Sequence, residues 1–145
     1  MYSILAQGIP VPMTPSSLVL PELGSARAGF PSPAEDLQER AIDLGQVLVS
    51  HPQATFLIRA RGSSMVDAGI HDNAILVVDR ALKAQHQDIV VAVVDGEFTI
   101  KRLYKNAGRV KLKAANPTFC DIVPKEGQTL EIWGVVTAAI NQYRK

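Results

Sequence analysis

The sequence predicts a mostly β protein: a barrel or sandwich of short antiparallel strands, preceded by an extended N-terminal arm and one or two short helices. Two observations support this. After Pro52, short segments alternate apolar and polar residues at the period of a strand and are separated by turn residues. Before residue 34 the chain holds six of its nine prolines, which disfavour both long helices and central strands. The 145 residues suit a single domain with a real core.

We expect residues 1–33 to form the arm and residues 34–145 to form the folded β domain. A short strand is predicted within the arm at Ser17–Leu20, where four residues free of proline include three large apolar ones. A disordered tail is the alternative interpretation of the same composition.

A helix is predicted between Pro33 and Ser50. Ser32 can cap it, with Glu35 three residues later. Gly45 weakens the helix, so we expect one broken helix or two short ones. The apolar stripe of this segment is Leu37, Ala41, Leu44 and Leu48.

The remaining chain predicts a series of strands joined by tight turns. Asp95-Gly96 is a strong hairpin signal between two of them, and Gly134 is expected to bend or bulge the last one. We expect Trp133 in that strand to belong to the core, the alternative being a dimer surface. The predicted strand regions are Ala54–Arg61, Ala74–Asp79, Asp88–Tyr104 on both sides of the hairpin turn, Arg109–Ala115 and Leu130–Ile140.

Composition excludes several classes of function. The formal net charge of +1 gives no overall basic field, so we expect no direct DNA binding and assign any DNA connection to a partner protein. Cys120 is the single cysteine and cannot form an intramolecular disulfide, which suits the cytoplasm. His51, His71 and His86 are scattered and none pairs with Cys120 at ligand spacing, so we expect no metal and no cofactor.

We also expect a soluble protein without a membrane anchor. The N-terminus lacks a basic region followed by an apolar core, and the longest apolar runs, such as Ile89–Val94, are too short to span a bilayer.

One short stretch raises a chemical question. In "RGSSMVDAGI" (Arg61–Ile70) two serines follow a predicted strand, and a serine hydroxyl needs a neighbouring base to act as a nucleophile. Strand alternation places Thr99, Lys101 and Leu103 on one face of the predicted hairpin, so Lys101 can be pressed against apolar neighbours. Desolvation lowers the pKa of a lysine, and a neutral amine can take the serine proton. The plain alternative is a Gly-Ser-Ser turn and a solvated lysine.

The order of several separate blocks resembles the self-cleaving proteins of the bacterial SOS response. These are the UmuD mutagenesis proteins, the LexA repressor and related phage repressors, which form one Ser-Lys peptidase family. The match is closest to the UmuD/MucA/RumA branch. The blocks are "AGFPSPAED" (28–36), "IDLGQVLVSHPQATFLIRARGSSM" (42–65), "DGEFTIKRL" (95–103) and "EIWGVV" (131–136).

The resemblance implies roles for four residues. Ser64, the serine before the methionine, would be the nucleophile, and Lys101 would be the general base. The bond between Ala28 and Gly29 would be cut, and backbone amides around Ser64 would form the oxyanion hole. Two departures are visible: alanine precedes the cleavage glycine where the best-known UmuD protein has cysteine, and the family's "DGD" loop is "HDNA" (71–74) here.

The resemblance also implies partners. Cleavage would be stimulated by the RecA filament on single-stranded DNA, and the shortened product would be an accessory subunit of a Y-family, UmuC-like translesion polymerase. A two-fold symmetric homodimer is expected as well.

Three other functions compete with this interpretation of the sequence. A phage-type repressor needs a helix-turn-helix before the peptidase domain, whereas only about 60 residues, many of them proline-rich, precede Ser64. A membrane signal peptidase needs an anchoring segment that the sequence does not show. A non-catalytic dimeric binding module that regulates a polymerase or repressor stays open, and it predicts that the arm is never removed.

Overall fold

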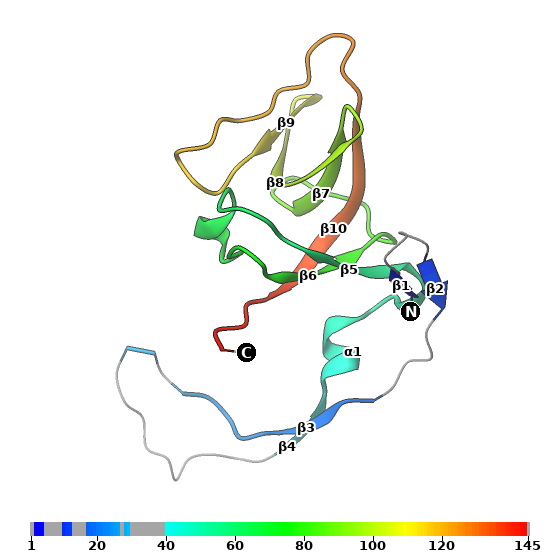
Figure 1. The fold of residues 1–145 in the computed structure, drawn as a ribbon, viewed down its shortest axis with the longest axis vertical. Helices are drawn as coiled ribbons and strands as arrows, with labels where there is room; N and C mark the ends of the chain where they lie inside the picture. Colours follow the sequence, from blue (N-terminus) through cyan, green and yellow to red (C-terminus); the bar gives the residue numbers. More distant parts are fainter. Residues whose placement is uncertain (1, 5–9, 13–16, 27, 30–39, 145) are drawn as a thin grey trace.

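A six-stranded antiparallel sheet forms the body of the protein (Figure 1). The computed structural model describes residues 2–4, 10–12, 17–26, 28–29 and 40–144. Within these residues the strands of the sheet lie in the order β5-β6-β10-β7-β8-β9. Their bounds are β5 Thr55–Arg59, β6 Ile75–Asp79, β7 Ile89–Val94, β8 Glu97–Asn106, β9 Arg109–Lys113 and β10 Leu130–Ile140. The mostly β fold class and the hairpin at Asp95-Gly96 are therefore confirmed.

Strand β10 joins the two halves of this sheet. Its first part, from Leu130 to Val135, pairs with β7, and its second part, from Val135 to Ile140, pairs with β6. The ladder with β7 shifts register between Ile132 and Gly134, which confirms the predicted irregularity at this glycine. Gly134 is also required by packing, because a Cβ there would lie 2.6 Å from Val78 Cγ1.

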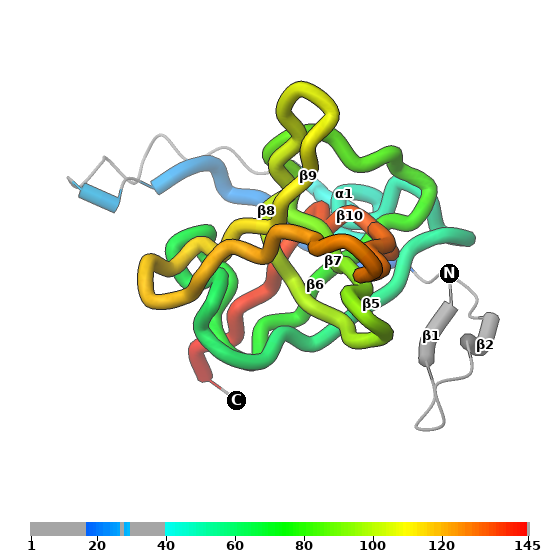
Figure 2. Tube along the Cα trace, turned by 90° about the horizontal axis from the view of Figure 1, so that it is seen from above, coloured from blue at the N-terminus to red at the C-terminus, as the bar shows by residue number. Residues whose placement is uncertain are grey.

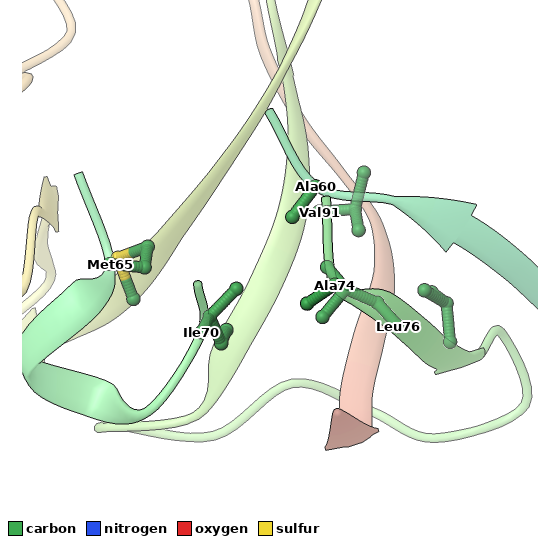
Figure 3. Close-up of a cluster of buried hydrophobic side chains, with 7 residues drawn as sticks. Ala60, Met65, Ile70, Ala74, Leu76 and Val91 are labelled. Carbon is green, nitrogen blue, oxygen red and sulfur yellow. The ribbon is translucent and has the colours of Figure 1, made fainter. Parts of the chain in front are cut away.

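Two clusters of buried apolar side chains support the two halves. The first is formed by the segment between β5 and β6, by β6 and by Val91 of β7, and Figure 3 shows side chains from these parts. Trp133 is half-buried against the same cluster. The buried members of the first cluster are Ala60, Met65, Ile70, Ala74, Leu76, Val78 and Val91, and those of the second are Val90, Ala92, Leu103 and Leu112.

The N-terminal segments form small ribbons outside this sheet. Strand β1 (Tyr2–Ile4) pairs with β2 (Pro10–Pro12), and β3 (Val19–Glu22) pairs with β4 (Arg40–Asp43). The strand predicted at Ser17–Leu20 is confirmed by β3, displaced by two residues. Figures 1 and 2 both show β3 running away from the six-stranded sheet.

The helix predicted from Pro33 to Ser50 is wrong for its middle part. Residues Arg40–Asp43 are a strand because they pair with β3, and an Arg40–Glu22 ion pair of 2.8 Å joins the two strands. The helix itself, α1, is only Leu44–Leu48, and the side chain of Asp43 caps it by accepting from the Gly45 amide at 3.0 Å. Two short 3₁₀ helices, η2 (Pro52–Ala54) and η3 (Val66–Ala68), flank β5 and the loop after it.

The predicted cap at Ser32, with Glu35 and Leu37, lies outside the described residues. Among the helices that the structure describes, none combines the length and apolar character that a bilayer crossing requires.

Candidate active site

Ser64 lies in the loop after β5, and hydrogen bonds to the backbone of Gly62 and Ser63 fix this loop. Gly62 has a φ of +88°, a conformation that favours glycine, and its amide donates to Asp72 Oδ1 at 2.8 Å. On the other side of the turn, Asn116 Nδ2 donates to the Ser63 carbonyl at 2.9 Å. Two polar side chains from other segments therefore fix the backbone just before Ser64, which is itself half-buried.

Met65 anchors the same loop to the core. Its side chain is only 3% exposed and lies within the first cluster, as Figure 3 shows. The Ala115 amide reaches its sulfur at 3.4 Å, and the Asp67 amide donates to the Ala115 carbonyl at 2.8 Å. Because the residue after the serine is buried, the loop cannot turn its serine away without exposing apolar surface.

Lys101 lies on β8 and meets Ser64 directly. Its side chain is 8% exposed, and its Nζ donates to Ser64 Oγ at 3.1 Å. The same nitrogen also donates to Thr99 Oγ1 at 2.9 Å and to the Ile100 carbonyl at 3.1 Å. Burial lowers the pKa of Lys101 below the ordinary value of 10.5, because desolvation disfavours the charged amine.

A pocket of about 250 Å³ opens beside this pair. Ser64 and Lys101 both line it, with apolar walls from Ile58, Ile100 and Phe98. Thr99, Arg59 and Arg61 also contribute to the lining, so apolar walls are combined with a few polar groups, as is usual in a ligand-binding cleft.

The structure brings together two of the four predicted site residues and leaves the other two apart. Ser64 and Lys101 are in contact, whereas Ala28 and Gly29 are exposed and neither lines the pocket. The described arrangement is therefore one in which the proposed cleavage site is not engaged.

Several supporting residues were missed by sequence reasoning. Thr99 was placed on the face of Lys101 but not recognised as its hydrogen-bond partner, although the spacing of two along a strand was a usable signal. Asn116 lies 53 positions from the residue it binds, and no local pattern could have found it. Asp72 belongs to the "HDNA" departure, and it still supplies the carboxylate that holds Gly62. Asn73 beside it takes a φ of 73°, which asparagine tolerates better than most residues.

Two of the three histidines have side-chain partners. His51 Nδ1 lies 2.6 Å from Asp79 Oδ2, and the His86 ring packs edge-on against Tyr104. Within the part of the chain that the structure describes, no group of three or more His, Cys, Asp or Glu side chains is placed to hold a metal ion.

Comparison with known proteins identifies a family and several relatives. The family described as Peptidase S24-like matches residues 21–137. Protein SamA of Salmonella typhimurium is 46% identical over 117 residues, which cover 81% of each chain. Protein MucA of Escherichia coli is 44% identical over 117 residues, 80% of each chain. LexA repressor 1 of Geobacter sulfurreducens is 40% identical over 127 residues, 85% of this chain and 61% of the repressor.

The match to the family covers well over half of the chain, and the relatives named above are similar across most of it. The comparisons therefore establish the family of the chain. The chain belongs to the Peptidase S24-like family, among its UmuD-like SOS mutagenesis proteins.

Proposed function

We propose that Ser64 and Lys101 cut the chain's own Ala28–Gly29 bond when a RecA filament on single-stranded DNA binds the protein. Membership of a LexA-type family of self-cleaving peptidases and an SOS mutagenesis role provide the setting. The observation that carries the proposal is the 3.1 Å contact between Lys101 Nζ and Ser64 Oγ on the wall of a pocket.

The hydrogen bonds of Lys101 indicate how loss of a proton makes it a base for Ser64. A charged amine has three N–H donors, and three acceptors surround it: Ser64 Oγ, Thr99 Oγ1 and the Ile100 carbonyl. When the amine loses a proton, one donor becomes a lone pair. Since the carbonyl can only accept, a hydroxyl must supply the proton that this lone pair takes. Ser64 can do so, and its oxygen then becomes a nucleophile.

Cleavage then follows in two stages. Ser64 Oγ attacks the Ala28 carbonyl carbon while its proton passes to Lys101, and the carbonyl oxygen gains the negative charge. Backbone amides stabilise that oxygen. The amides of Gly62, Val66 and Asp67 already have acceptors, so those of Ser63, Ser64 and Met65 are our candidates.

The C–N bond breaks as Lys101 returns the proton to the Gly29 nitrogen, leaving an ester on Ser64. Water then hydrolyses this ester, giving a carboxylate on Ala28 and a free serine.

The exposed position of Ala28 and Gly29 supports a conformational step before chemistry. About 35 residues separate Gly29 from Ser64, enough to reach the pocket of the same chain or of a partner in the homodimer that we propose. A filament can stimulate cleavage only if it binds the engaged arrangement more tightly than the resting one. The shortened form, from residue 29 onward, would then serve as accessory subunit of a UmuC-like, error-prone translesion polymerase in the cytoplasm.

The test is an intact-mass time course of the purified chain at pH 10, beside Ser64→Ala and Lys101→Ala. We expect loss of residues 1–28 from the wild type alone, because only the wild type holds both reacting groups. Activated RecA filament is then added at pH 7.5, where the same mass loss should become faster. A chain that stays whole at pH 10 and with filament would be a non-catalytic dimeric binding module.

A further inference from the structure

Basic side chains gather around one tyrosine on the outer face of β8 and β9. The register pairs Arg102 with Lys113, and Tyr104 with Lys111. Arg109 follows at the end of the same face of β9, because successive side chains alternate. We call Arg102, Arg109, Lys111 and Lys113 with Tyr104 the basic strip. The turn that joins β8 to β9 projects from the body in Figure 2.

The charges of this strip are poorly balanced within the chain. Arg102 and Lys113 are directly opposite each other, and like charges in that position destabilise a pair of strands. Among the described residues, one ion pair involves the strip: Lys111 Nζ lies 3.6 Å from Asp121 Oδ2, and both side chains are well exposed. By contrast, Arg40 and Glu22 meet at 2.8 Å. An anion from outside the chain would remove this imbalance.

The ring of Tyr104 holds two of the cations in place. Lys113 Nζ lies 4.8 Å and Lys111 Nζ 5.7 Å from the ring centroid, and the edge of His86 packs against the same ring at 5.1 Å. These contacts direct the ammonium groups toward one aromatic surface. Charged residues often protect the free edge of a sheet, but this role does not fully explain the cations. The edge of β9 is already partly paired, because Leu112 exchanges two backbone hydrogen bonds of 2.8 Å with Ile122.

We infer that the basic strip binds single-stranded nucleic acid, with phosphates at the four cations and a base against Tyr104. Cations at alternate residues of a strand repeat about every 7 Å, which follows an extended phosphate backbone. An aromatic ring between cations is the arrangement by which proteins bind single strands without regard to sequence. An acidic peptide would use the cations, but its carboxylates would not stack on the ring.

If the basic strip binds nucleic acid, the expectation of no direct DNA binding, which was drawn from the net charge, is wrong. The total of +1 excludes a strong field over the whole molecule, but acidic residues gather elsewhere, for example Asp95 and Glu97 at the β7–β8 turn. A local strip of this kind gives weak, salt-sensitive binding rather than tight binding.

The test is fluorescence anisotropy of a labelled oligothymidylate with the full-length chain, whose intact mass is checked afterwards. If each of the four cations neutralises one phosphate, the slope of log K against log salt is about −3. Lys111→Gln with Lys113→Gln should weaken binding about tenfold at 50 mM salt and bring the slope to about −1.4. Lys125→Gln with Arg144→Gln removes the same charge from exposed positions elsewhere and should change Kd less than about twofold.

A third variant separates the two classes of ligand. Tyr104→Leu should weaken the oligonucleotide several-fold more than a polyglutamate peptide, since both ligands lose the positioning of Lys111 and Lys113 but only a base stacks on the ring. Equal losses in the strip and control doubles would refute the strip as a site. Tighter binding of polyglutamate than of oligonucleotide, with no greater effect of Tyr104→Leu on the oligonucleotide, would assign it to an acidic protein segment instead. Neither result depends on Ser64, so failure here leaves the proposed cleavage untouched.

Discussion

The hydroxyl of Thr99 offers the sharpest test of Lys101 as a base. Thr99→Val keeps the shape of the side chain and removes one acceptor that lies 2.9 Å from Lys101 Nζ. A hydrogen bond to a charged donor contributes about 1.5–3 kcal/mol, and one between neutral groups about 0.5–1.5 kcal/mol. The substitution therefore disfavours the charged lysine over the neutral one by about 1.4 kcal/mol, which lowers the pKa of Lys101 by about one further unit.

The kinetic consequence is opposite to that of an ordinary active-site mutation. Below the pKa of Lys101, the rate of self-cleavage without filament should rise about tenfold per pH unit, because the neutral fraction rises at that rate. It should level off below pH 10.5, since burial lowers the pKa from that value. In Thr99→Val the whole profile should move about one unit toward lower pH, so that cleavage at pH 7–8 becomes about tenfold faster.

The assay is the first-order rate of mass loss between pH 6 and 11. Thr137→Val, which makes the same chemical change on β10 away from the pocket, should leave the profile unmoved. A flat wild-type profile from pH 7 to 10 would refute lysine as the base. A Thr99→Val profile that stays in place or moves to higher pH would refute the accepting role given to the Thr99 hydroxyl.

Two further predictions concern stability. Gly134→Ala should lower the free energy of unfolding by about 1–3 kcal/mol in urea denaturation, because its Cβ would meet the fully buried Val78 side chain at 2.6 Å; no loss would mean that the two strands separate freely there. Lys101→Met should remove a pH dependence: the unfolded chain binds the lysine proton more tightly than the folded one, so wild-type stability rises with pH from the lowered folded-state pKa up to 10.5. With Ser64→Ala present in both chains, so that neither cuts itself at pH 10, urea midpoints at pH 7 and 10 should therefore differ less in Lys101→Met than with Lys101, and equal differences would contradict the lowered pKa.

Local patterns were sufficient to predict most of the sheet. The alternation of β5 and β8 and the turn at Asp95-Gly96 depend on neighbouring residues, and so they could be found from the sequence. The segment Arg40–Asp43 was mistaken for helix because its partner strand lies some twenty residues earlier, and pairing outweighed its apolar stripe. The candidate site also combines residues that local patterns reveal with residues that only the tertiary structure reveals. Its serine and lysine are recognisable by motif, whereas Asn116 and Asp72 reach the serine loop through tertiary structure alone.

The position of β10 has a consequence for the timing of synthesis. The serine loop follows β5 and is packed with β6, while the lysine is carried on β8, and β10 is the strand that lies between β6 and β7. A ribosome makes β10 after all of these, at about 5–20 residues per second. The nascent chain therefore has a serine and a lysine but no completed sheet to hold them 3.1 Å apart. If Ser64 and Lys101 cut the chain as proposed, self-cleavage therefore has to wait until residues 130–140 have been made and have paired with β6 and β7.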